Sequence, residues 1–331
     1  MVSAYAFLNC LNELIKQMSC ISNNSFSKVL RISYGNLTHI LSRFYSSATK
    51  SIRNVAIIAH VDHGKTTLVD SLIKCGSSSE ISNERLLDCN DIEKERGITI
   101  LAKSTYINYT DHKINIVDTP GHADFGGEVE RALSLVDGAV LVVDATEGPM
   151  SQTKYVLEKA IKKNLKFIVV INKIDRETSR VEAVESEILD LFLQLEAKDF
   201  QLEYSTLYAS AKNRWASREF PKTRDYLSSP NNMSPLIDEI IRTIPQPKKD
   251  ATRPFSMLVN STERIPFIGK CAFGRVESGS VSIGNLIRGI SHASGAAFNG
   301  NVQKLFAKSG LENVCDLLNA RYILKRLLLE I

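Results

Sequence analysis

One loop of the sequence has the residue types and the spacing that hold a phosphate group. An apolar run ends at Ala59, and residues 60–67 then read HVDHGKTT. This is the phosphate-loop pattern G-x-x-x-x-G-K-[ST], with alanine in place of its first glycine. Gly64 lets successive backbone N–H groups point at phosphate oxygens. Lys65 can reach the β- and γ-phosphates of a nucleotide, and Thr66 can bind Mg²⁺.

A second polar turn follows the apolar run 114–117. Its residues, 118–122, read DTPGH. The carboxylate of Asp118 can hold Mg²⁺ through water, and the amide of Gly121 can donate to a γ-phosphate. Because the carboxyl ends of parallel strands meet at one edge of a sheet, we expect this turn to lie beside the phosphate loop.

A third turn, residues 172–175, reads NKID and follows the apolar run 167–171. The carboxylate of Asp175 can accept from both the N1–H and the exocyclic amine of guanine, a pair that adenine cannot supply. A buried carboxylate left unpaired would cost several kcal/mol, which is on the order of 10⁴-fold discrimination. The turn therefore predicts GTP rather than ATP as ligand. A backbone N–H of residues 210–212, SAK, can bond the guanine carbonyl.

The elements around these turns predict the fold class. Apolar runs of strand length alternate with helical periodicities near 66–75, 127–135, 151–163 and 180–195. Such alternation indicates an α/β fold with a doubly wound, mostly parallel sheet, whose ligand lies at the carboxyl ends of the strands. Three motifs in this order, each after a strand, predict a P-loop GTPase domain.

A charged segment lies between the first two turns. Residues 91–100 read DIEKERGITI. A loop between phosphate-binding elements can order around a nucleotide and be released on hydrolysis. We expect Thr99 to meet Mg²⁺ and the γ-phosphate in this way.

Together these motifs resemble those of the translational GTPases. The segments that carry the resemblance are 60–68, 95–100, 118–122 and 172–175. Within that family, DFGGEVER at 124–131 and VDATEGPM at 143–150 resemble the TypA/BipA group. Residues 208–212 and 215–217 look like its plant mitochondrial-type branch. Alanine is usual in this family at the position of Ala59.

The resemblance implies a ribosome-stimulated GTPase that uses GTP, GDP and Mg²⁺. His122 would orient the attacking water, with Lys65 and Thr99 completing the catalytic set. Thr66, Thr99 and Asp118 would hold Mg²⁺, and Asp62 would help place His122 or a monovalent cation. The residues expected at the nucleotide are Asp62, His63, Gly64, Lys65, Thr66, Thr67, Asp118, Gly121, Asn172, Lys173, Asp175, Ser210, Ala211 and Lys212.

Residues 1–50 differ in composition from the rest of the chain. They contain nine serines and five basic side chains against one acidic side chain. Transit peptides of organelles are basic, serine-rich and poor in acids. The segment predicts mitochondrial targeting, with chloroplast targeting and a disordered extension without an address as the alternatives.

The chain also changes character after the GTPase domain, which we expect to span residues 51–247. A linker with Pro245 and Pro247 precedes short glycine- and serine-rich strand patterns at 252–314, which predict a smaller, incomplete antiparallel β-barrel. Residues 315–331 have no Gly or Pro and read as a helix foreign to the family. We therefore expect a truncated protein, and the alternative to a ribosome-associated GTPase is a nucleotide-binding remnant without productive ribosome binding.

Composition excludes several other protein classes. The 331 residues are 44% hydrophobic and 24% charged, which is typical of a folded protein and not of a disordered, collagen-like or coiled-coil chain. No uninterrupted apolar run reaches about 18 residues. We expect a monomer that binds the ribosome in an organelle, and neither DNA nor a membrane as a partner.

Overall fold

The fold is known from a computed structural model. It describes residues 51–76, 102–120, 125–221, 232–247, 250, 252–265, 269–291, 294–309, 312–314 and 326–330. All of these belong to one compact unit, Ser51–Ile331. The predicted leader and the site residues Thr99, Gly121 and His122 lie outside the described residues.

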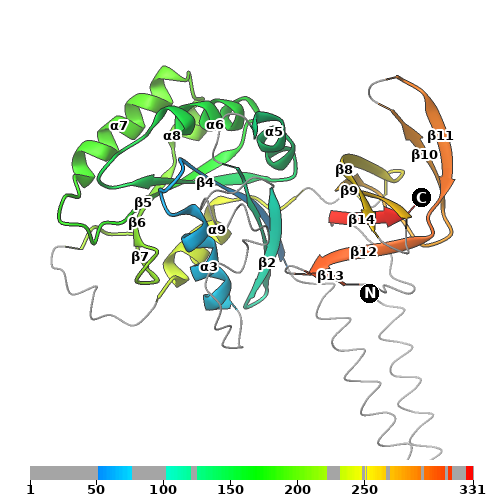
Figure 1. Cartoon of the computed structure of the whole chain (residues 1–331), viewed down its shortest axis with the longest axis horizontal. Helices are drawn as coiled ribbons and strands as arrows, with labels where there is room; N and C mark the ends of the chain where they lie inside the picture. Colours follow the sequence, from blue (N-terminus) through cyan, green and yellow to red (C-terminus); the bar gives the residue numbers. More distant parts are fainter. Residues whose placement is uncertain are drawn as a thin grey trace, which may run out of the picture. The chain divides into compact units, whose positions relative to one another are not determined.

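A seven-stranded sheet forms the centre of the predicted GTPase domain (Figure 1). Its order is β2-β3-β1-β4-β5-β6-β7. The strands are β1 (Ser51–Ala59), β2 (Lys103–Tyr109), β3 (His112–Asp118), β4 (Gly138–Asp144), β5 (Lys166–Asn172), β6 (Ser205–Ser210) and β7 (Trp215–Ser217). The five strands from β3 to β6 in this order are parallel, and β2 and β7 are antiparallel edge strands. The predicted α/β class with a mostly parallel sheet is confirmed.

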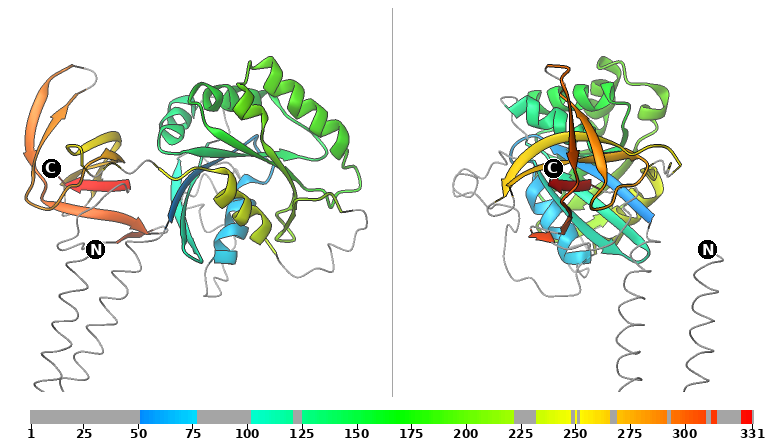
Figure 2. Two further views of the ribbon diagram at one scale, coloured as in Figure 1. Left: turned by 180° about the vertical axis from the view of Figure 1, so that it is seen from behind. Right: turned by 90° about the vertical axis from the view of Figure 1, so that its right-hand side faces the viewer.

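Helices cover both faces of this sheet (Figure 2). One face packs against α3 (Lys65–Gly76) and α9 (Ser234–Thr243). The other packs against α5 (Gly126–Ser134), α6 (Ser151–Lys162), α7 (Val181–Gln194) and the short α8 (Asp199–Leu202). Alternate residues of each strand enter the two cores; in β1, for example, Ile57 faces α3 while Ile58 faces α6 and its neighbours. Because both faces are covered, all seven residues of β4 are buried.

Antiparallel sheets follow the linker, as the glycine- and serine-rich pattern predicts. One has the strand order β13-β12-β14-β9-β8, and β10 and β11 form a separate two-stranded ribbon. The strands are β8 (Ser256–Ile265), β9 (Gly269–Ser278), β10 (Leu286–Ile290), β11 (Ala297–Asn301), β12 (Lys304–Ser309), β13 (Glu312–Val314) and β14 (Arg326–Glu330). Ala272, Val276, Val281, Val302 and Leu305 form a small core. An incomplete barrel stays a prediction.

The helix predicted for residues 315–331 is wrong for the part that the structure describes. Residues 326–330 form strand β14, which pairs antiparallel with both β9 and β12. Helical propensity is a weak preference, and two open strand edges that can be satisfied by one apolar segment outweigh it. No helix in the described part of the chain is long and apolar enough to cross a membrane.

Candidate nucleotide-binding site

The phosphate loop connects β1 to α3 through two residues in the left-handed backbone region. Asp62 has φ +62° and Gly64 has φ +90°. The first turn of α3 then closes with a 2.9 Å bond from the Leu68 N–H to the Gly64 carbonyl. Such alternation turns successive backbone N–H groups toward one concavity, where the N-terminus of the helix adds its own unpaired donors. The loop therefore has the backbone geometry of an anion cradle.

The predicted phosphate-binding lysine and the predicted magnesium carboxylate lie together. The Lys65 Nζ is 2.7 Å from Asp118 Oδ1, and it also donates to the Thr119 carbonyl. Both charged side chains are buried. The contact arises because β1 and β3 are parallel neighbours, with Ile57 opposite Asp118. The Thr119 hydroxyl donates to the Ile57 carbonyl at 2.8 Å and fixes the turn on β1.

Asn172, at the end of β5, joins the phosphate loop to the loop at residues 210–212. Its Nδ2 donates to the His63 carbonyl at 2.9 Å, and its Oδ1 accepts from the Ala211 N–H at 3.0 Å. On α3, the Ser71 hydroxyl donates to the Ala211 carbonyl at 2.9 Å. Asn172 is 1% exposed. Both ends of its amide are thus used to hold three segments of the site in register.

Lys173 makes a second link to the phosphate loop. Its backbone is left-handed, with φ +63°. Its ammonium donates to the Asp62 carbonyl at 2.5 Å and lies 2.7 Å from Asp144 Oδ2. Asp175 follows two residues later and is partly buried, whereas Lys212 is exposed. The residues predicted to read the base therefore lie at the same edge of the sheet as the phosphate loop.

Sequence reasoning missed Asp144 as a member of this site. It ends β4, is fully buried, and stands opposite Asn172 in the sheet. Burial raises the pKa of this carboxyl, but the Lys173 ammonium, the Thr146 N–H and Arg176 outweigh burial and hold the pKa below its ordinary value. The available signal was an acidic residue at the end of an otherwise apolar strand, next to two strands whose ends were already assigned.

His63 is a buried member of the phosphate loop. Its Nδ1 accepts from the Asp144 N–H at 3.3 Å, and its Nε2 lies 3.4 Å from Glu147 Oε2. Its ring meets that of His60 edge-on at 5.1 Å. Burial first, and the neighbouring His60 second, lower the pKa of His63, so the ring is neutral at pH 7. In this form His63 packs the loop against the end of β4.

These loops can be compared with known proteins. The family model described as the elongation factor Tu GTP binding domain matches residues 50–246. The chain belongs to this family. The match covers the predicted GTPase domain up to residue 246 and every site residue named above.

Curated relatives of this chain include several bacterial proteins named large ribosomal subunit assembly factor BipA. The chain is 49% identical over 266 residues to the protein from Bacillus subtilis, covering 80% of this chain and 42% of that one. It is 45% identical over 268 residues to the protein from Escherichia coli strain K12, covering 80% of this chain and 43% of that one. The chain thus spans less than half the length of these relatives, and its predicted likeness to the TypA/BipA group is confirmed.

Solved structures agree on the fold. The chain is similar to a bacterial selenocysteine-specific elongation factor EF-Sec, with TM-score 0.58, 23% identity and coverage of 85% of this chain and 42% of that one. It is also similar to the elongation factor SelB from Methanococcus maripaludis in complex with GppNHp, with TM-score 0.59, 22% identity and coverage of 85% and 52%. The fold of a GTP-binding domain followed by β-structure is shared.

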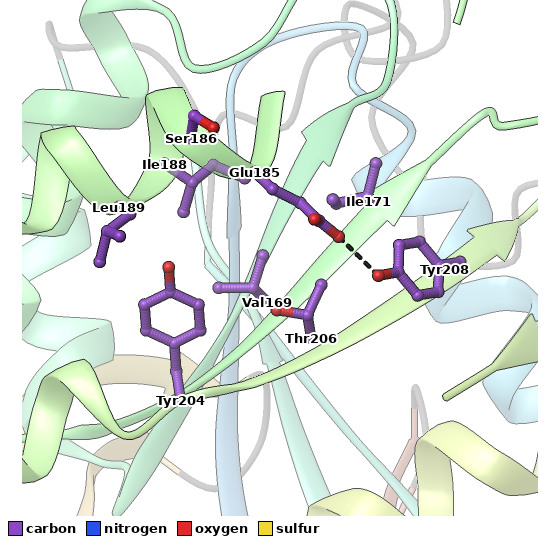
Figure 3. A pocket seen from close by; sticks show the side chains of 9 residues that line it. All are labelled: Val169, Ile171, Glu185, Ser186, Ile188, Leu189, Tyr204, Thr206 and Tyr208. Atoms are coloured by element: carbon purple, nitrogen blue, oxygen red, sulfur yellow. Dashed lines mark hydrogen bonds between the residues drawn. The ribbon is translucent and has the colours of Figure 1, made fainter. Parts of the chain in front are cut away.

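A cavity in this GTP-binding domain lies on a different part of the sheet. It has a volume of about 390 Å³ and lies between α7, β5 and β6 (Figure 3). Across it, the Tyr208 hydroxyl donates to Glu185 Oε1 at 2.5 Å. Burial and the Glu185 carboxylate raise the pKa of Tyr208 to about 12. The bond joins α7 to β6 two residues before Ser210, where the loop at residues 210–212 begins.

Proposed function

We propose that the chain binds GTP and GDP with Mg²⁺ and hydrolyses GTP to GDP and phosphate. The observation that carries this proposal is the pair of bonds from Asn172 and Lys173 to the backbone of the phosphate loop. Through them, residues suited to guanine and residues suited to a triphosphate meet at one edge of one sheet. Family membership supports the same ligand.

The residues have separate roles in this proposal. Phosphate oxygens would take the place of the Asp118 carboxylate and the Thr119 carbonyl as partners of Lys65. Asp175 would accept from guanine, and an N–H of residues 210–212 would donate to its carbonyl. Because the Ala211 N–H is already used by Asn172, that donor would be one of its neighbours.

Mg²⁺ fits the chemistry of these residues. Thr66 and Asp118 supply oxygen donors, and we assign Thr99 as a third. Within the described residues no group of three or more His, Cys, Asp or Glu could hold a metal. Mg²⁺ characteristically uses few protein ligands and completes its shell with phosphates and water, so the donor set suits it. When bound, the ion would neutralise charge on the β- and γ-phosphates, while His122 orients the attacking water.

We further propose that the chain acts on the ribosome, in translation or ribosome assembly, as a monomer within an organelle. The relatives named as large ribosomal subunit assembly factors support the first part. The composition of residues 1–50 supports the second, with the mitochondrion as the compartment and the chloroplast as the alternative. A fluorescent protein fused behind residues 1–50 distinguishes these compartments, and a diffuse cytosolic signal would contradict both.

Phosphate release by the full chain tests the enzymatic proposal. With Mg²⁺ present, GTP should be hydrolysed slowly, ribosomes from the organelle should accelerate the reaction, and ATP should yield no phosphate. The Lys65→Ala variant provides the control for contaminating GTPases, because it lacks the phosphate-binding ammonium. Sedimentation with ribosomes and a GTP analogue separates the alternatives: a chain that binds nucleotide but never sediments with ribosomes is a nucleotide-binding remnant.

A further inference from the structure

We propose that Asp144 is a positioning residue that holds the Lys173 ammonium on the backbone of the phosphate loop and thereby slows nucleotide release. The inference rests on the proposed nucleotide site. It adds a residue that lies outside the phosphate loop and outside the segments 172–175 and 210–212, and it assigns that residue a role in the rate of nucleotide release.

The surroundings of Asp144 are those of a fully buried, fully partnered anion. Its Oδ1 accepts from the Thr146 N–H at 2.8 Å. Its Oδ2 lies 2.7 Å from the Lys173 ammonium and 3.2 Å from Arg176 Nη1. A buried carboxylate is retained only where cations and hydrogen bonds compensate for lost water. The two cations differ, because Lys173 is 19% exposed while Arg176 is 47% exposed. Lys173 is therefore the less hydrated partner.

Lys173 transmits this position to the phosphate loop. One ammonium bridges the Asp144 carboxylate and the Asp62 carbonyl. Both backbone ends of the bridge are left-handed, at φ +63° for Lys173 and φ +62° for Asp62. Non-glycine residues adopt this conformation uncommonly, and contacts with their surroundings hold them in it. A lysine stem is flexible and its ammonium is strongly hydrated, so without an anionic partner it would turn to solvent and release Asp62.

The phosphate loop touches the end of β4 at a second point. His63 Nδ1 accepts from the backbone N–H of Asp144 itself. Asp144 thus meets the loop directly through His63 and indirectly through Lys173 and Asp62. Losing the carboxylate removes only the indirect contact, since the backbone N–H stays. The effect of Asp144→Asn should therefore pass through Lys173.

A double-mutant cycle between Asp144 and Lys173 tests this. The dissociation rate of a fluorescent GDP analogue is measured in the full chain for Asp144→Asn, Lys173→Met and the double variant. Asp144→Asn should speed release about tenfold, the size of coupling between contacting residues. In the Lys173→Met background the same substitution should add nothing.

Controls separate positioning from general damage. Glu147→Gln removes a carboxylate of the same cluster that faces His63 and not Lys173, so it should leave GDP release unchanged. If Asp144→Asn does not fold, Asp144→Ala, which buries no polar group, replaces it in the cycle. If the effects of the two substitutions on GDP release are additive, the positioning role proposed for Asp144 is wrong, but the proposed nucleotide site is unaffected. Unchanged release in Lys173→Met would instead contradict the proposed nucleotide site.

Discussion

A Cβ atom on Gly64 would lie 2.4 Å from the Nδ2 of Asn172. That nitrogen donates to the carbonyl of His63, the residue just before this glycine. The side-chain amide of Asn172 therefore fills the space that the side chain of any other residue at position 64 would need. At this point the phosphate loop and the end of β5 are in direct contact through the Asn172 side chain.

Gly64→Ala should weaken GDP binding at least ~100-fold, because it combines a backbone strained at φ +90° with displacement of Asn172. Isothermal titration calorimetry of the full chain measures this. Gly284→Ala is the matched control: its φ is +87°, but nothing lies within 4 Å of the new Cβ. That variant should lose about 1 kcal/mol of stability and keep its affinity for GDP. Equal affinity of Gly64→Ala and the wild type would show that the loop binds no phosphate.

Asp175→Asn should change the base that is preferred. An amide N–H can donate to the carbonyl that xanthine carries where guanine has its amine, so GTP affinity should fall about 100-fold or more while XTP affinity rises. Competition between the two nucleotides for the variant measures the change. Asp190→Asn, an exposed acid on α7, makes the same chemical change away from the site and should leave GTP preferred. Preference for GTP in both variants would mean that Asp175 is not the base contact.

His122→Ala should reduce GTP turnover about 100-fold or more and leave the affinity for GTP within about twofold, because the proposed role is to orient water in the transition state. Single-turnover hydrolysis and equilibrium binding of a GTP analogue give the two quantities separately. A loss of affinity equal to the loss of turnover would assign His122 to binding, and unchanged turnover would remove it from the mechanism.

Glu239 on α9 should make stability depend on pH in the acidic range. It is buried, and it meets Arg242 Nη2 at 2.6 Å and Arg218 Nε at 2.9 Å. Burial would raise its pKa, but hydrogen bonds led by Arg242 lower the pKa from 4.5 to about 2. Since the folded-state pKa lies below the unfolded one, the stabilisation is complete above pH 4.5 and is lost as the pH falls toward 2.

Urea unfolding at several pH values measures this effect. Relative to wild type, Glu239→Gln should lose about 2 kcal/mol at pH 7, and the difference should shrink as the pH falls. The neighbouring Asp238→Asn faces solvent and should change little at any pH. A pH-independent difference would show that the loss comes from packing and not from charge.

Sequence patterns predicted the main sheet well and the contacts within the site poorly. Strands such as β4 and β5 are continuous apolar runs, so their ends, and the loops after them, could be located from periodicity alone. The bonds that Asn172 makes at both ends, and the bridge from Asp144 through Lys173, depend on left-handed backbone angles and side-chain reach. No spacing rule encodes these quantities.

The error at β14 has a different cause. The run at 326–330 has leucines at its centre and no glycine, which suits a helix when read locally. Its conformation is decided by β9 and β12, whose paired residues lie about 20 to 60 positions earlier and offer an edge on each of its sides. Local propensity cannot report such distant partners.

The most direct test of the central claim is a calorimetric titration of the full chain with GDP and, separately, with ADP, both with Mg²⁺. We predict binding of GDP at a single site, with a dissociation constant at least about 100-fold below that for ADP. The claim is that one guanine nucleotide contacts both the phosphate loop at Lys65 and the turn 172–175 at Asp175. Equal affinity for the two nucleotides, or no heat from GDP, would contradict it.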